Sequence, residues 1–163
     1  MGALLKWLPE MAVGVDEMDQ AHQWFLAELE RLHTVPDCLL STEIAALTSA
    51  MARDFQEEEF AMAEIGSPDL PTHREQHRRV LEAFQDIAPG DHASLREVLA
   101  MMPRWFLFHL SAMDLPLAIA VRSVSSASVA TPATTGASIP LPPRVGKDRS
   151  CRSRDSPATD GLT

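Results

Sequence analysis

Apolar and polar positions alternate with a helical period through the first 122 residues of this 163-residue chain. Apolar side chains recur every three or four positions, and no alternating run of β-branched residues competes with that pattern. The segment that begins after Asp16 or Asp19 shows it in Phe25, Leu29 and Leu32. The pattern therefore predicts an all-α fold.

Proline and glycine residues divide the pattern into four segments. Pro36, Gly66 and the run Pro89-Gly90-Asp91 fall between them, where helices commonly end. The predicted helices run from Asp16 or Asp19 to Thr34, from Ser41 to Gly66, from Pro71 to Ile87, and from Ser94 to Val121. Because their connections are short, they pack most simply as an antiparallel up-down-up-down four-helix bundle.

Two prolines, Pro103 and Pro116, lie inside the fourth predicted helix. Each lacks an N–H and crowds the carbonyl group four residues earlier, so each is expected to kink the helix or open it locally.

The last 41 residues differ sharply in composition from the rest of the chain. Residues 123–163 are rich in Ser, Thr and Pro and contain no Trp, Phe, His or Glu. Such a segment gains too little apolar burial to offset the entropy lost on ordering. The sequence therefore predicts a folded domain at residues 1–122 and a disordered, low-complexity tail at 123–163.

The charge balance narrows the range of partners. Acidic residues number 23 against 14 basic residues, for a formal charge of -9. Five basic and three acidic residues belong to the tail, so the acidity is concentrated in the domain. This argues against nucleic acid and anionic membranes as main partners. We expect no transmembrane run and no secretory signal.

The cysteine content is consistent with a reducing compartment. Cys38 and Cys151 are too few and too far apart in sequence to suggest a disulfide framework. We therefore expect a cytoplasmic protein, and we expect it to be a monomer.

His73 and His77 are the first candidates for chemistry. On a helix, residues four apart lie on one face with about 5–6 Å between their Cβ atoms, close enough for both rings to reach one metal ion. Alone, the pair indicates a solvated helix face more than a metal site.

Each predicted helix offers at least one possible metal ligand. Asp54 and Glu58 share a stripe with Met51, Phe55 and Met62, which points inward. Burying carboxylates is costly unless they are paired, and a metal ion is one way to pair them. Histidines and carboxylates on four helices are suitable for a dinuclear site. The candidates are His22, Asp54, Glu58, His73, His77, His109 and Asp114.

The step from His109 to Asp114 is unusual for two ligands on one helix. Five residues correspond to about 140° around a regular α-helix. The two side chains would approach the metals from different sides, or across an opened turn that Pro116 could provide.

Four separated motifs together resemble the bacterial hemerythrins in order and spacing. These motifs are "WLPEMAVGVDEMDQAHQWF", "DFQEEEFAM", "HREQH" and "HLSAMD". The resemblance covers roughly residues 5 to 118. It implies a four-helix bundle with a non-helical N-terminal arm, to which Trp7, Val13 and Val15 would belong, and a non-haem di-iron centre that binds molecular oxygen reversibly.

The resemblance also implies a ligand set. His73, His77 and His109 would hold one iron and His22 would help to hold the other. Glu58 and Asp114 would bridge the two, and an oxide or hydroxide would complete the bridge. Such proteins serve as oxygen carriers, stores or sensors rather than as enzymes.

This chain departs from the family at Asp54, where the family carries a histidine ligand. Asp54 would bind iron directly, bind it through water, or leave the second iron weakly held. An anionic oxygen donor favours ferric over ferrous iron, so an oxidase- or peroxidase-like redox enzyme is the first alternative. A metal-free interaction bundle is the second, although it would have to bury the ligand candidates unpaired.

Other polar residues near these motifs are predicted to be ordinary. Glu57 and Glu59 flank Glu58 and are expected to be solvated, since three consecutive helical positions cannot share one face. His33 and His92 are expected at the surface, at a helix end and in a turn.

Overall fold

The computed structural model describes residues 5 to 128, and within this range the chain is helical with no strand. The all-α prediction is confirmed. The helices are α1 (Asp16–Leu32), α2 (Asp37–Glu64), α3 (Leu70–Gln85), α4 (His92–His109) and α5 (Leu115–Ser128). A short 3-10 turn, η1 (Pro9–Met11), precedes α1, and a π-helical segment, η2 (Leu110–Asp114), joins α4 to α5.

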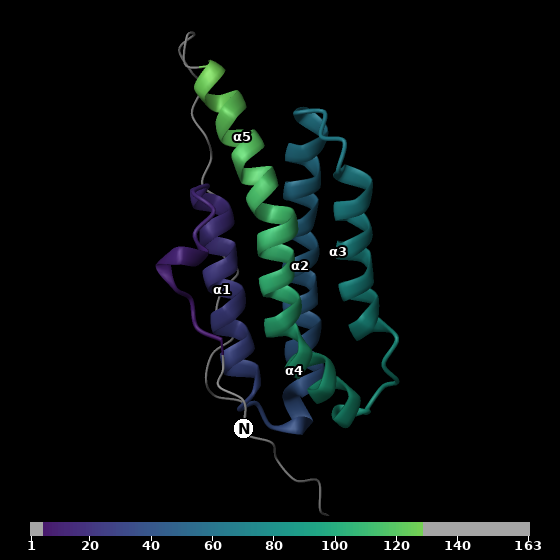
Figure 1. Cartoon of the computed structure of the whole chain (residues 1–163). Helices are drawn as coiled ribbons and strands as arrows, with labels where there is room; N and C mark the ends of the chain where they lie inside the picture. The colour runs from purple at the N-terminus through teal and green to yellow at the C-terminus, as the bar shows by residue number, and fades with distance from the viewer. Residues whose placement is uncertain (1–4, 129–163) are drawn as a thin grey trace, which may run out of the picture.

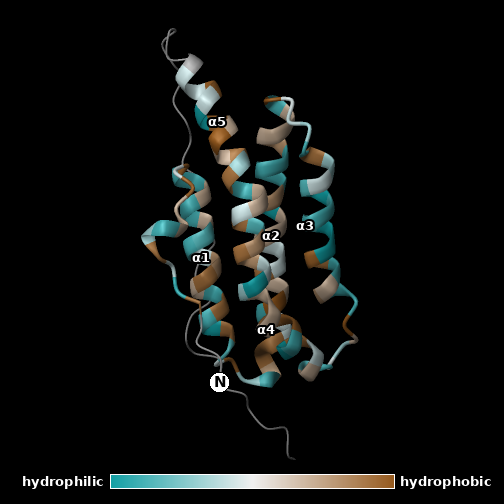
Figure 2. Cartoon of the chain, in the orientation of Figure 1, coloured by the Kyte–Doolittle hydropathy of each residue, from teal (hydrophilic) through white to brown (hydrophobic). Residues whose placement is uncertain are grey.

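The helices form the predicted up-down-up-down four-helix bundle. Figure 1 shows α1, α2 and α3 running antiparallel to their neighbours in the chain, while α4, η2 and α5 together form the fourth rod. Hydrophilic residues predominate on the exposed side of α3, and hydrophobic residues gather where the rods face one another (Figure 2). The bundle therefore has a single apolar interior.

That interior is built from stripes with helical spacing. On α4 the buried side chains are Leu95, Leu99, Met102 and Phe106, and the next buried position in the same rhythm is His109. Fully burying a side chain such as Leu99 contributes roughly 1.5–3 kcal/mol. On α3 the buried positions are His73, His77, Val80 and Phe84. Histidines thus occupy places in the stripes that would otherwise carry core hydrophobes.

Two helix bounds differ from the prediction by four residues or more, and the others differ by at most three. Helix α2 begins at Asp37 rather than at Ser41, because Pro36 takes the extended N-cap position and Leu40 is already fully buried. Helix α5 continues to Ser128, past the expected domain boundary at residue 122. The rest of the predicted tail, residues 129–163 with Cys151, lies outside the described residues.

The two prolines of the fourth rod behave differently. The chain stays α-helical through Pro103, whereas the helix opens into η2 just before Pro116. The predicted opening is therefore found at the second proline only.

The fourth rod also tests the expectation that the chain contains no transmembrane segment. By length and composition alone, His92–Ser126 is long and apolar enough to cross a membrane, contrary to that expectation. A mostly buried core helix of a soluble protein passes the same test, whereas 28% of the apolar window of this stretch is buried. The stretch as a whole supplies Leu99, Met102 and Phe106 to the bundle interior.

The N-terminal arm is fastened to the bundle near the start of α1. The carboxylate of Asp19 accepts hydrogen bonds from the backbone N–H groups of Val13 and Gly14, at 2.7 and 3.0 Å. Arg122 on α5 donates to the carbonyl of Val13 at 2.6 Å. Gly14 has φ +80, and a Cβ there would lie 2.1 Å from the Arg122 guanidinium. The arm contains the η1 turn, so it is not wholly non-helical.

Candidate metal centre

The η2 segment brings two candidate ligands of one rod together. The N–H of Leu115 donates to the carbonyl of Leu110, five residues earlier, and such π turns are frequent at functional sites. The wider turn rotates Asp114 toward the face that carries His109, and Asp114 Oδ1 lies 3.1 Å from His109 Nε2. The opened turn anticipated near Pro116 is thus present, and Pro116 itself has no N–H to offer the carbonyl of Ala112.

Three histidines and one glutamate form what we call the three-histidine group: Glu58, His73, His77 and His109. Nε2 of His73 and Nε2 of His77 each lie 3.2 Å from Glu58 Oε2. Nε2 of His77 and Nε2 of His109 are 3.1 Å apart. All four side chains are buried. The group therefore presents several nitrogen donors and a carboxylate to one point in the core.

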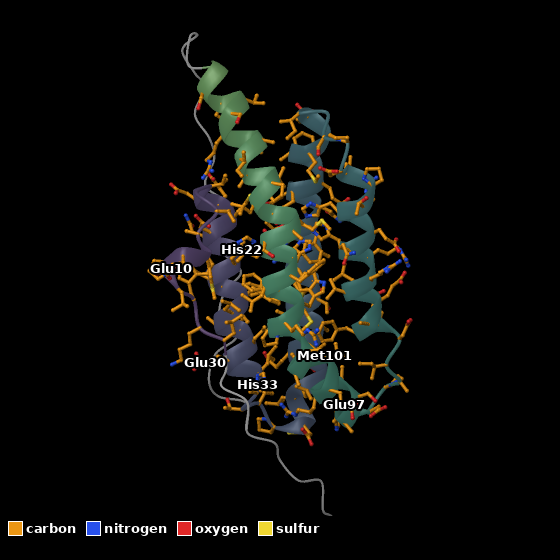
Figure 3. The ribbon with its side chains drawn as sticks, viewed as in Figure 1. Glu10, His22, Glu30, His33, Glu97 and Met101 are labelled. Carbon is orange, nitrogen blue, oxygen red and sulfur yellow. The ribbon has the colours of Figure 1, made fainter. Side chains whose placement is uncertain are left out.

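A second cluster, the carboxylate group, consists of His22, Glu58 and Asp114. His22 Nε2 lies 3.2 Å from Asp114 Oδ2, while the other oxygen of Asp114 faces His109 and His73. Figure 3 shows His22 directed from α1 toward the fourth rod, while Glu10, Glu30 and Glu97 lie at the periphery. Glu58 belongs to both groups, and Asp114 touches both, so the two clusters are adjacent.

Polar atoms that lack hydrogen-bond partners indicate whether a cation fits between the two groups. Within the described chain, both carboxylate oxygens of Asp114 and the Nδ1 atoms of His22 and His109 are buried without a hydrogen-bond partner. Buried polar atoms are rarely left in that state. A cation would satisfy the Asp114 oxygens and the facing ring nitrogens of His77 and His109 together. Imidazole and carboxylate donors are those that suit iron and similar ions.

The charges inside the site shift the pKa of several members. Burial alone would lower the pKa of His73, but the neighbouring carboxylates of Asp114 and Glu58 outweigh it and raise the pKa to about 9. The pKa of His22 is raised in the same way by Asp114. Burial would raise the pKa of Asp114, yet the surrounding histidines hold it well below its usual range. The metal-free site is thus an array of mutually stabilised ions.

One side of the site opens onto a cavity of about 170 Å³. His22, Glu58, His109 and Asp114 line it, whereas His73 and His77 do not. Five aromatic residues line it, namely Trp24, Phe25, Phe55, Trp105 and Phe106. Charged and polar side chains line the rest, among them Glu17, Gln20, Arg53 and Glu57. The carboxylate group is therefore the side that a small molecule reaches.

Asp54 lies on the wall of this cavity, outside both groups. It is half-buried, and burial together with the negative charge of Glu58 raises its pKa to about 7. The structure brings the other six predicted ligands together. Direct ligation by Asp54 stays a prediction.

Glu59 is a site residue that the sequence did not reveal. Its carboxylate contacts His77 Nδ1 at 3.1 Å and accepts a hydrogen bond from Arg74 Nε at 2.8 Å, so the prediction that it is solvated was wrong. The spacing within α2 could not show this contact, because both partners lie on α3. Glu57 is exposed, as predicted. His33 is exposed at the end of α1, and His92 is partly buried at the start of α4.

Two curated relatives match this chain in sequence. A Bacteriohemerythrin from Stenotrophomonas maltophilia is 27% identical over 120 residues, which cover 69% of this chain and 78% of the relative. A Bacteriohemerythrin from Ralstonia nicotianae is 28% identical over 118 residues, which cover 68% of this chain and 84% of the relative. No family model and no solved structure matches the chain.

Proposed function

On the premise that the chain is bacterial hemerythrin-like, which its two relatives support, we propose that it binds molecular oxygen at a non-haem centre of two iron ions. The observation that carries this proposal is the convergence of six buried ligand atoms from all four rods, with the oxygens of Asp114 lacking hydrogen-bond partners in the described chain. Ferrous iron, when bound, supplies the electrons that oxygen binding requires.

Each residue of the two groups has a part in this proposal. His73, His77 and His109 would hold one iron, and His22 would hold the other. Glu58 and Asp114 would bridge them, since each lies between the two groups. The donor set is neutral nitrogen on one side and richer in carboxylate on the other, so the two metal positions are chemically unequal.

The cavity supports binding on the side of His22. It is small, and Phe25, Trp105 and Phe106 form an aromatic part of its wall, while Arg53, Asp54 and Glu57 belong to the rest. The aromatic part favours an uncharged diatomic ligand over ions. Reversible binding therefore depends on this wall.

Asp54 favours a second candidate function, an oxidase- or peroxidase-like redox enzyme. Its carboxyl group lies on the cavity wall with a pKa raised to about 7 by burial and by Glu58, so it can hold or release a proton near neutral pH. Protons delivered beside reduced oxygen promote its further reduction rather than its release. A sustained consumption of oxygen or peroxide with an added electron donor would favour this function over binding.

The proposal is tested by loading the full chain with ferrous iron under anaerobic conditions. Iron per chain and the absorption spectrum are then recorded before exposure to oxygen, after it, and after removal of oxygen under argon. We expect two irons and a spectral change that reverses. An iron content near zero in a folded chain would refute the metal centre, and an irreversible change would favour the enzyme.

A further inference from the structure

His77 is held on the side that faces away from the metal ligands. Its Nδ1 lies 3.1 Å from Glu59 Oε1, while its Nε2 faces Glu58 and His109. The other oxygen of Glu59 accepts a hydrogen bond from Arg74 Nε at 2.8 Å. A chain of three polar side chains therefore runs from Arg74, which is exposed, to a ligand in the core.

The same ring is also stacked on an aromatic neighbour. The rings of Phe55 and His77 lie 3.8 Å apart between centroids, with 5° between their planes. Stacking fixes the plane of the imidazole but not its direction, because a half-turn of the ring about its bond to Cβ leaves the stack intact. That half-turn would exchange ring nitrogens for ring carbons at both contacts. The contacts of Nε2 with Glu58 and of Nδ1 with Glu59 both discriminate between the two orientations, and Glu59 is the partner on the side away from the metal ligands.

We propose that Glu59 is a positioning residue of the three-histidine group: it holds the proton of His77 on Nδ1 and so keeps the lone pair of Nε2 directed at the metal. The inference rests on the proposed function for the identity of the metal, but not for the orientation of the ring. A carboxylate behind a ligating imidazole also makes that imidazole a stronger donor.

Among the described residues, two other histidines of the site lack a hydrogen-bond partner at Nδ1, which distinguishes His77 from them. Nδ1 of His22 and Nδ1 of His109 have no hydrogen-bond partner in the part of the chain that the structure describes. Glu59 therefore strengthens His77 as a donor in a way that His22 and His109 lack, and His77 does not line the cavity. It is expected to stabilise the more oxidised state of the iron that His77 holds.

A purely structural role for Glu59 is the alternative. The ion pair with Arg74 is exposed on the arginine side, and such pairs contribute little to stability. If Glu59 only joined α2 to α3, removing Arg74 would matter as much as removing Glu59. If Glu59 positions His77, the Arg74→Ala variant keeps the ring orientation and most of the metal affinity.

The test uses the full chain with 15N-labelled histidine, first metal-free and then with Zn2+ as a redox-inert probe. Long-range 15N–1H spectra report which ring nitrogen of His77 carries the proton. Zn2+ affinity and iron reduction potential are measured on Glu59→Ala, Glu59→Gln and Arg74→Ala. Glu82→Gln is the matched control, because Glu82 pairs with an arginine on the surface of α3 and touches no histidine.

For Glu59→Ala we expect mixed protonation of His77 and a loss of roughly 10–100-fold in Zn2+ affinity. For Glu59→Gln, whose amide oxygen still accepts the hydrogen bond, we expect the wild-type tautomer and a higher reduction potential. This variant decides the question if Glu59→Ala does not fold. A wild-type tautomer and affinity in Glu59→Ala, or an equal loss in Glu82→Gln, would overturn the inference.

Failure of the proposed function would look different. A wild-type chain that takes up no iron would refute the iron centre, yet the metal-free spectra would still show whether Glu59 fixes the tautomer of His77.

Discussion

The three-histidine group and the carboxylate group share Glu58 but differ in what surrounds them. The half of the three-histidine group formed by His73 and His77 is closed, because neither residue lines the cavity, although Glu58 and His109 of the same group do. Phe55 stacks on His77 and Glu59 contacts its Nδ1. The carboxylate group has a single histidine, His22, and opens onto the cavity. The difference shows how one bundle can combine a metal position that is held firmly with one that remains accessible.

The sequence departs from the hemerythrin pattern that it resembles on the side of the site that lines the cavity. Asp54 lies on the cavity wall beside the carboxylate group, and every member of the three-histidine group matches the resemblance. We expect a substitution on the accessible side to change reactivity first, and a substitution in the closed half to change metal retention first. The following predictions test that division.

Asp114→Ala should have the largest effect, because Asp114 contacts both groups. Its oxygens lie 3.2 Å from His22 Nε2 and 3.1 Å from His109 Nε2. We expect metal content near zero after reconstitution. In the metal-free chain we expect a loss of stability that approaches the roughly 3–5 kcal/mol typical of breaking a buried ion pair. Metal analysis and chemical denaturation measure the two effects. A folded variant that keeps wild-type metal content would contradict the bridging role.

His77→Ala should remove one metal and leave the other. The substitution deletes a neutral nitrogen donor from the closed half, so affinity there should fall by more than the roughly 10–100-fold that loss of an outer partner costs. Iron per chain is the measurement, with exposed His33→Ala as the control. Unchanged iron content, or an equal loss in the control, would show that His77 does not hold a metal ion in the closed half.

The stability of the metal-free chain should fall as the pH rises. The pKa of His73 in the folded chain is raised to about 9, since its carboxylate partners outweigh burial. This stabilisation is complete below about pH 6.5 and is lost as the pH rises through 9, a change on the order of 3 kcal/mol. The raised pKa of Asp54 acts in the same direction from about pH 4 to 7.

Chemical denaturation of the metal-free chain at pH 6 and pH 10 measures this change. In the His73→Gln variant, the loss of stability near pH 9 should disappear. Stability that stays level or increases between these two pH values would exclude the proposed charge state of His73. Metal affinity should change in the opposite direction, because imidazoles must lose their protons to ligate.

Asp54→His should have the smallest effect. The property that changes, either the autoxidation rate or the iron content, distinguishes two roles of Asp54. If Asp54 ligates the second iron, the histidine variant removes a negative charge at low dielectric and should slow autoxidation, by about tenfold for a barrier change of about 1.4 kcal/mol. If Asp54 stops short of the metal, the variant should gain iron instead. Iron per chain and the time course of the spectrum after oxygen exposure separate these cases. No change in either would place Asp54 outside the coordination sphere.

The sequence was sufficient for the fold because the helical signals agreed with one another. Apolar spacing, proline and glycine all marked the same four segments, and the bundle follows from their short connections. The start of α2 was misjudged because Pro36 could be interpreted as an end, although proline is also favourable just outside a helix start.

The site was only partly predictable, and the reason is geometric. Seven ligand candidates could be named from spacing, from polar positions in apolar stripes and from the resemblance, and six of them meet in the structure. The meeting of His109 and Asp114 could be anticipated only as one of two options, because a π turn depends on how the rod packs against its neighbours. Glu59 could not be found at all, since its partners His77 and Arg74 belong to another helix.

The most direct test of the paired site is a crystal structure of the iron-reconstituted chain with anomalous data collected at the iron edge. The account predicts two peaks. One should lie among His73, His77 and His109, and the other should lie beside His22, facing the cavity, with Glu58 and Asp114 between them. A single peak, or iron bound away from these residues in a folded chain, would contradict it.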